Sequence, residues 1–361
     1  MSSSLLCTTR ECYFTQLSAT LNPNEPNFVK TQWITSEDVN VEHLLDVFTA
    51  VDASSDSVWR ACAHFMQHLY WHKNRLVVLK PKIEELPNYH SSKPECFFEL
   101  SRLFGSVRNQ VERKRLLTCA LKLGRERGSG CRVARILRHL ADANGLMGLL
   151  KEGIQLVKEA SEIGEQLGDR VVQGQCLIGL AWLLCEDEQL DTAEEAASHA
   201  IALFPENGEQ HRLCGSHRIL GDIYRSKGET EKAIHHSKVA LRIAPSFDCH
   251  EEPFWVHYRL AGLFYDEGRF DDANTHIERA KSHAVNSTYN LGYAMEMQTK
   301  IWRKQHRLEE ARSEVLRAAD VYETLGAAKD VEDCGTLLRD IQNGLDTAAA
   351  SGQSDFNCEL L

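Results

Sequence analysis

The chain lacks the short motifs that mark common enzyme classes. It has no Gly-x-x-x-x-Gly-Lys-Ser/Thr phosphate-binding loop and no Gly-x-Ser-x-Gly nucleophile motif. Gly145 and Gly148 lie at a predicted helix end without the strand that a phosphate loop needs. These absences argue against nucleotide and serine-hydrolase chemistry within this sequence. We therefore expect no cofactor and no enzymatic activity.

Signals for membranes, export and nucleic acid are also missing. Residues 1–14 show no charged-then-apolar leader, and no apolar run approaches the roughly 20 residues that span a bilayer. The formal net charge is −11, whereas binding to phosphate backbones needs a basic face. The twelve cysteines are scattered without a Cys-x-x-Cys, which favours reduced, packed thiols. These features predict a cytoplasmic protein with no membrane span and no nucleic-acid partner.

What the sequence does contain is a repeat with a period of 40 residues. One copy begins Leu220-Gly221-x-x-Tyr224, and the next begins Leu260-Ala261-x-x-Phe264. In each copy a glycine separates two apolar stripes at helical spacing, which predicts two helices joined by a turn. Recurring helix pairs of this length indicate a solenoid.

Small residues keep this register along the chain. With Leu220 as the seventh position of a unit, the eighth position is Ser101, Ala141, Ala181, Gly221, Ala261 and Thr299. The twenty-seventh position is Ala120, Ala160, Ala200, Ala240, Ala280 and Ala318. Small side chains are needed where two helix axes approach most closely. Bulky residues at the eleventh position should fill the space beside them, and Asn144, which stands at this position in one unit, predicts looser packing there.

The repeats define the expected organisation of the chain. Residues 95–343 form the array of six units, with a closing helix over 331–341. Residues 1–31 are an extension with little pattern, and 32–90 read as a degenerate helical cap of the kind that covers the first unit of a solenoid. The small, polar residues 344–361 predict a disordered tail. Glycines at the thirty-fifth position suggest left-handed residues that close helices, namely Gly128, Gly168, Gly208 and Gly326.

The repeat pattern resembles that of tetratricopeptide repeat (TPR) proteins. Leu-Gly/Ala-x-x-Tyr/Phe followed by the recurring alanines is similar to the family's motif over about residues 95–343. The resemblance implies an all-α, right-handed superhelical solenoid of about six hairpins. The segments 228–233 and 267–273 further resemble arrays found in fungal proteins C-terminal to STAND (NLR-like) NTPase modules.

In the TPR family a second stripe on the first helix of each unit, at positions two, five, nine and twelve, lines a concave groove. Arginine and aromatic side chains, which dominate binding hot spots, are frequent in this stripe. Its candidate partner-binding residues are Arg102, Arg135, Arg138, Asp142, Trp182, Arg218, Asp222, Arg225, Trp255, Tyr258, Tyr265, Tyr293, Lys300 and Arg303, with Glu296 in the same stripe. Together these residues predict a scaffold that binds a protein or peptide with acidic and apolar side chains. Trp182, Trp255 and Tyr258 are also candidates for packing roles.

Other functions compete with the scaffold. The array is alternatively the sensor or regulatory arm of a STAND NTPase whose NTPase module lies outside this sequence. His64, His68 and His72 share one predicted helix face and suggest a metal-dependent enzyme, but no ligand completes the set, so we expect no metal. The terminal Cys358-Glu359-Leu360-Leu361 fits a loose prenylation motif, against which stand Glu359 and the lack of basic residues upstream.

Overall fold

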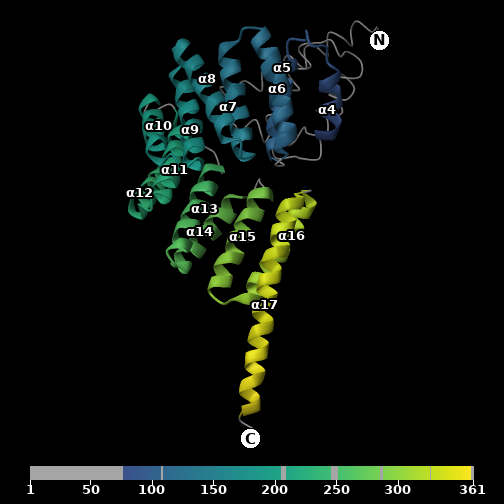
Figure 1. The fold of residues 1–361 in the computed structure, drawn as a ribbon, viewed down its shortest axis with the longest axis vertical. Coiled ribbons are helices and arrows are strands. Elements are labelled where there is room, and N and C mark those ends of the chain that lie inside the picture. The colour runs from purple at the N-terminus through teal and green to yellow at the C-terminus, as the bar shows by residue number, and fades with distance from the viewer. Residues whose placement is uncertain are drawn as a thin grey trace, which may run out of the picture. The chain divides into compact units, whose positions relative to one another are not determined.

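The computed structural model describes residues 76–106, 109–204, 209–244, 251–284, 288–325 and 327–358. All the regular elements in these ranges are helices, fourteen in number, labelled α4 to α17 (Figure 1). The predicted all-α solenoid of TPR-like hairpins is thus confirmed. The extension 1–31, most of the predicted cap, His64, His68 and His72 lie outside the described ranges.

The chain divides into two compact units, Met1–Phe204 and Pro205–Leu361. In the first unit the described helices are α4 (Leu76–Glu85), then the hairpins α5 (Lys93–Ser106) with α6 (Gln110–Glu126), α7 (Gly130–Leu146) with α8 (Leu150–Gln166), and α9 (Arg170–Glu186) with α10 (Leu190–Leu203). In the second they are α11 (Gln210–Ser226) with α12 (Thr230–Ile243), α13 (Glu251–Asp266) with α14 (Phe270–His283), α15 (Thr288–Lys304) with α16 (Leu308–Thr324), and α17 (Ala328–Cys358). The described residues of each unit therefore contain three helical hairpins.

The small-residue register lies where the helices of a hairpin pack together. Every residue of the eighth and twenty-seventh positions is buried, and all six alanines at the twenty-seventh position are 0% exposed. Two residues at the eighth position are polar, and the hydroxyl of each donates a hydrogen bond to a carbonyl of its own helix. Ser101 Oγ donates to the Phe98 carbonyl at 2.5 Å, and Thr299 Oγ1 donates to the Met295 carbonyl at 2.9 Å. A hydroxyl is tolerated at these buried contacts because it already has an acceptor.

The turns differ in part from the sequence expectation. Gly128 and Gly168 have φ of +70° and +65°, the left-handed conformation that suits glycine after a helix. The other two predicted positions, Gly208 and Gly326, lie outside the described ranges. Within hairpins, Glu188 (φ +59°) and His306 (φ +60°) adopt the same conformation without being glycine. Non-glycine residues in this region are uncommon and strained, so these turns are set by the packing of the helices they join.

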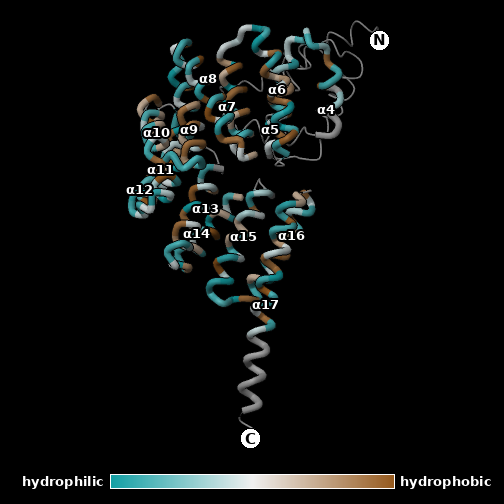
Figure 2. Tube along the Cα trace, in the orientation of Figure 1, coloured by the Kyte–Doolittle hydropathy of each residue, from teal (hydrophilic) through white to brown (hydrophobic). Residues whose placement is uncertain are grey.

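Apolar residues cluster between the helices of each unit, and hydrophilic residues dominate the outer faces (Figure 2). In the first unit one buried cluster runs from Ile83 to Leu183. In the second, a cluster centred on the fully buried Tyr322 joins α15, α16 and α17. Asn144 is buried within the first cluster's helices, and its Oδ1 has no hydrogen-bond partner in the described ranges. An unsatisfied amide oxygen at this depth is destabilising.

The described cysteines are mainly packing residues. Cys96, Cys176, Cys214 and Cys334 are buried. Burial raises the pKa of Cys176 and of Cys334 to about 12. Both thiols are therefore protonated and unreactive at neutral pH.

The C-terminal helix is longer than expected. The sequence predicts a closing helix over 331–341 followed by a disordered tail over 344–361, but α17 continues without interruption to Cys358. Composition alone favours disorder in this stretch, whereas several of its residues are good helix formers, such as the run of alanines at 348–350.

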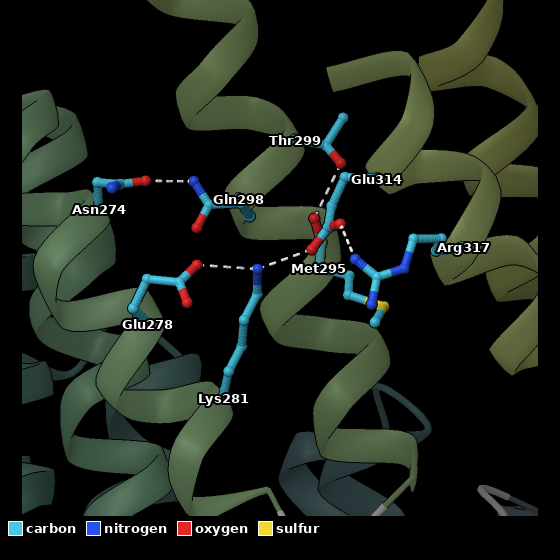
Figure 3. A network of polar contacts seen from close by, with 8 residues as sticks. All are labelled: Asn274, Glu278, Lys281, Met295, Gln298, Thr299, Glu314 and Arg317. Atoms are coloured by element: carbon cyan, nitrogen blue, oxygen red, sulfur yellow. Dashed lines mark hydrogen bonds and ion pairs between the residues drawn. The ribbon is translucent and has the colours of Figure 1, made fainter. Parts of the chain in front are cut away.

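A buried polar network fixes α16 against its neighbours (Figure 3). Glu314 is 3% exposed and accepts from Lys281 Nζ of α14 and Arg317 Nη1 of its own helix, each at 2.7 Å. Glu278 accepts from the same lysine at 3.1 Å, and Gln298 of α15 donates its side-chain amide to Asn274 Oδ1 of α14. The network positions the last hairpin next to the one before it.

Candidate functional site

The predicted stripe lies on the first helices of the hairpins, which are α5, α7 and α9 in the first unit and α11, α13 and α15 in the second. We refer to the side chains at stripe positions two, five, nine and twelve as the first-helix face. In the first unit α7 contacts α9 and ion pairs join α5 to α7, and in the second unit α13 contacts both α11 and α15, so these side chains lie on adjoining helices. In the described part of the second unit, ion pairs join α11 to α13 and α15 to α17.

In the first unit, arginines of the first-helix face are held by carboxylates of the same unit. Arg102 Nη1 lies 2.9 Å from Glu99 Oε2. Glu99 is 1% exposed, and burial raises its pKa despite the adjacent arginine. Arg135 pairs with Glu95, and its guanidinium lies 4.3 Å from the centre of the Phe98 ring. A cation over an aromatic face is stabilised, so Arg135 is held in a defined position.

The next turn of α7 carries Arg138 and Asp142. Their side chains approach to 3.4 Å, and Arg113 of α6 approaches the same carboxylate at 4.0 Å. Arg138 Nη2 donates to His139 Nε2 at 2.7 Å. Burial and then the surrounding arginines lower the pKa of His139 well below its usual value, so this imidazole is neutral.

Trp182 of α9 is half-buried and packs against the core of the first unit. A side-chain carbon added at Gly145 of α7 would come within 2.6 Å of its indole ring. Trp182 therefore has a packing role, as considered from the sequence.

In the second unit the arginines also have internal partners. Arg218 Nε lies 3.2 Å from Glu252 Oε2, and Asp222 lies between Arg218 at 3.6 Å and Arg259 at 3.4 Å. Arg225 reaches over Gly262 of α13 to pair with Asp266. A side-chain carbon at position 262 would lie 3.2 Å from this guanidinium, so glycine leaves room for the pair.

The remaining charged residues of the face lie on α15. Arg303 Nη1 is 2.9 Å from Asp340 of α17, and Lys300 is 4.0 Å from Glu296. Glu296 also accepts from the Tyr322 hydroxyl at 3.1 Å, and burial raises the pKa of Glu296.

Three predicted aromatic residues form one cluster. Trp255 and Tyr258 of α13 and Tyr293 of α15 have ring centres 5.8–6.0 Å apart and are tilted or edge-on to one another. All three are half-buried. Burial raises the pKa of Tyr258 to about 12, so its hydroxyl remains a hydrogen-bond donor. Tyr265 lies apart from this cluster, against Phe270 at the start of α14.

Sequence reasoning missed the carboxylates that partner the arginines, among them Glu95, Glu252, Asp266 and Asp340. A signal for them does exist. For Arg135, Arg218 and Arg225 an acidic residue 34 to 41 positions away lies on the neighbouring first helix and pairs with the arginine.

Histidines face one another within hairpins of the second unit. His217 and His257 each face a histidine of the following helix, His236 and His276, with Nδ1 atoms 3.0 and 2.9 Å apart. Within the described ranges, no group of three or more His, Cys, Asp or Glu side chains has a geometry suited to a metal ion. Among the same residues, no helix is long and apolar enough to cross a bilayer.

Comparison with known proteins agrees with the repeat pattern. Residues 132–206 match the model of the tetratricopeptide repeat. No curated protein sequence matches the chain.

The fold is similar to that of several solved structures. A Rap protein in complex with competence and sporulation factor is 11% identical, with 94% of this chain and 98% of that chain covered and a TM-score of 0.59. The APC/C hetero-tetramer Cut9-Hcn1 is 13% identical, with 90% and 58% covered and a TM-score of 0.52. A STAND protein with a tetratricopeptide repeat sensor from Pyrococcus horikoshii is 16% identical, with 86% and 53% covered and a TM-score of 0.45. At these identities the likeness concerns the fold, and together with the matched segment it confirms that this chain carries tetratricopeptide repeats.

Proposed function

We propose that this protein is a non-enzymatic scaffold of the cytoplasm that binds a peptide or protein on its first-helix face. Tetratricopeptide repeats and the fold they build support a protein-interaction scaffold in general. The Rap protein of similar fold was solved with competence and sporulation factor bound, which is a precedent for a ligand on this kind of scaffold.

The observation that carries the proposal is the aromatic cluster of Trp255, Tyr258 and Tyr293. Its rings are half-buried on neighbouring first helices, and aromatic side chains with a polar edge are the residues on which interface energy concentrates. The cluster would hold apolar side chains of the partner, and the arginines around it would orient the partner's polar groups.

The internal ion pairs refine this picture. Because Arg218 and Arg225 already have carboxylate partners, a binding partner must exchange with Glu252 or Asp266 to reach them. These arginines therefore contribute to the choice of partner more than to affinity. The aromatic cluster offers half-buried ring surface and would provide the main area of contact.

The test is quantitative capture of partners from native cytosol with matched variants. One variant carries Trp255→Ala and Arg135→Gln, a change on the first-helix face of each unit. The control carries Lys158→Gln and Lys238→Gln, exposed residues of the second helices α8 and α12. Circular dichroism and thermal melting would first establish that both variants are folded. We expect the first variant to lose the captured protein and the control to retain it; loss in the control with retention in the first variant would refute the proposed face.

A regulatory role as the sensor arm of a STAND NTPase would use the same surface. It rests on the resemblance of segments 228–233 and 267–273 to such arrays. Copurification of the protein with a separate P-loop NTPase, lost in the first-helix variant, would favour that role over a free-standing adaptor.

A further inference from the structure

One carboxylate of the first unit serves two arginines. Glu95 of α5 lies between Arg132 and Arg135 of α7, with Arg132 Nε 3.3 Å from one oxygen and Arg135 paired with the other. The side chains of Arg132 and Arg135 are 36% and 40% exposed, while Glu95 is 21% exposed. Both arginine side chains are therefore partly exposed and share the Glu95 carboxylate, and Glu99 of α5 also interacts electrostatically with Arg135.

The surroundings of this pair are positive as well. Helix α7 carries three arginines but only one acidic residue, Asp142, and that carboxylate is shared by Arg138 and Arg113. His139 lies among these groups, and the arginines act with burial to keep it neutral. Although the chain has a net charge of −11, the surface around Arg132 and Arg135 carries more positive than negative side chains.

The second unit provides a contrast. There Arg225 pairs with Asp266 and Arg303 with Asp340, one acid for each base. Arg218 and Arg259 lie among two carboxylates, Glu252 and Asp222. An anionic ligand thus gains more from the arginines of α7 than from those of α11, α13 or α15.

We propose that Arg132 and Arg135 bind the phosphate group of a phosphorylated side chain in a protein partner. The proposal rests on the proposed function, since the phosphate belongs to a peptide held on the first-helix face. Arginine suits this role because its planar fork donates two parallel hydrogen bonds to phosphate oxygens. The contact of Arg135 with Phe98 holds one of the two forks in place before the ligand arrives.

Glu95 gives this site its preference for phosphate over carboxylate. An incoming aspartate or glutamate offers the same group that Glu95 already provides, and Glu95 competes from within the chain. A phosphate monoester carries about −1.5 to −2 charges at neutral pH and three strong acceptor oxygens. It can bind both guanidinium groups while displacing Glu95 into solvent, which a single carboxylate cannot do with comparable gain.

The experiment uses the full chain and three pools of fluorescent degenerate peptides that differ only at a fixed central residue, which is phosphoserine, serine or glutamate. Fluorescence anisotropy measures the affinity for each pool. We expect the phosphoserine pool to bind at least about tenfold more tightly than the glutamate pool, since charge-assisted hydrogen bonds are worth more than tenfold each. The variant with Arg132→Gln and Arg135→Gln should lose this advantage.

Glu95→Gln should strengthen binding, whereas the double arginine variant weakens it. A gain in affinity cannot result from misfolding, so this variant separates recognition from folding. Removal of the Glu95 carboxylate should raise the affinity for the phosphoserine pool and also allow the glutamate pool to bind. The difference in affinity between the two pools should therefore become smaller. The matched control is Glu159→Gln, whose partner Arg125 forms an exposed ion pair on the second helices α6 and α8, and it should leave every pool unchanged.

Each other outcome overturns the proposal. Equal binding of the phosphoserine and glutamate pools by the wild type would show a general anion surface, and tighter binding of a single-stranded oligonucleotide would assign the arginines to nucleic acid. Binding of all three pools alike, with loss in Trp255→Ala, would retain the proposed function and refute the phosphate site. No binding of any pool refutes the phosphate site, and only the capture experiment then decides the proposed function.

Discussion

Lys281 Nζ and Glu314 Oε1 lie 2.7 Å apart and join α14 to α16, with the side chain of Glu314 only 4% exposed. Arg317 is the second cation on the same carboxylate, and Glu278 is a second anion near the lysine. The four charged side chains alternate in sign, from the solvent-exposed Glu278 through Lys281 and the buried Glu314 to Arg317 (Figure 3). A buried carboxylate is stable in its charged form only while cations of this kind remain beside it.

Replacement of Lys281 by methionine should therefore destabilise the second unit by about 2 kcal/mol, less than the loss of a completely isolated buried charge because Arg317 remains. Urea unfolding followed by circular dichroism at pH 7 measures the change. The control is Arg312→Met, which removes an exposed ion pair with Glu309 on the same helix and should cost about 0.5 kcal/mol or less. Equal costs for the two variants would show that the buried network does not stabilise the hairpin.

The paired histidines predict a loss of stability in mild acid. Burial, with the facing histidine as the next contribution, lowers the pKa of His217 to about 4 and that of His257 to about 3. In the unfolded chain these groups titrate near 6.5, so the unfolded state takes up protons first as the pH falls. Stability from these pairs is complete above about pH 6.5 and declines as the pH falls towards 4 and 3.

The double variant His217→Phe and His257→Phe tests this pH dependence. Phenylalanine keeps an aromatic ring at both positions but does not titrate. Urea midpoints between pH 7.5 and 4.5 should therefore fall less steeply than in the wild type. His199→Phe changes an exposed histidine of α10 and should keep the wild-type slope. Parallel slopes for all three proteins would remove the histidine pairs as the cause.

The small-residue register predicts a penalty for enlargement at Gly221. A side-chain carbon at this position would lie 3.0 Å from Ser237 Oγ and 3.4 Å from the Ala233 carbonyl oxygen of α12. Gly221→Leu should cost about 1–3 kcal/mol because α11 and α12 must separate. Thermal melting of Gly335→Leu provides the control, since nothing lies within 4 Å of the carbon added in α17. That variant should be neutral or slightly stabilised, because glycine is unfavourable within a helix; a similar loss in both proteins would contradict close packing at Gly221.

Asn144 is a position where a substitution should stabilise the protein. Its buried Oδ1 has no hydrogen-bond partner in the described part of the chain, and other units place Leu184, Tyr224 or Phe264 at the same register position. Asn144→Leu should gain about 1 kcal/mol by removing an unsatisfied polar group. The midpoint of thermal unfolding should rise, and a fall would show that the amide nitrogen or the shape of asparagine is needed there.

Much of the fold could be predicted because its determinants are local and periodic. The alanines of the twenty-seventh position define the contact between helices in every hairpin, and all of them are buried. The turns at Glu188 and His306 could not be predicted in the same way. Their left-handed backbone is imposed by the helices on either side, and neither residue type signals it. The helix over 344–358 was not predicted, because the small, polar residues of this segment favoured disorder and no apolar stripe indicated a helix.

The stripe pattern predicted aromatic residues on neighbouring first helices, but not how the charged residues of the stripe would pair. The stripe rule identified Trp255, Tyr258 and Tyr293 on neighbouring helices, and the structure brings these three into one cluster. It also selected Tyr265, which lies apart because its place at the end of α13 faces Phe270. Arg132 was missed because it precedes the first stripe position of its unit by three residues. The sharing of Glu95 depends on distances between helices that one sequence does not contain.

In the second unit Arg218 pairs with Glu252 and Arg225 with Asp266, and both ion pairs connect α11 to α13. The hairpin that begins with α13 thus carries the counter-charges for these two arginines of α11. One unit further along, Asn290 and Lys304 stand at the positions that correspond to Glu252 and Asp266. Deletion of the α13 hairpin alone would therefore leave Arg218 and Arg225 without acidic replacements, so the length of the array cannot change there without new counter-charges for α11.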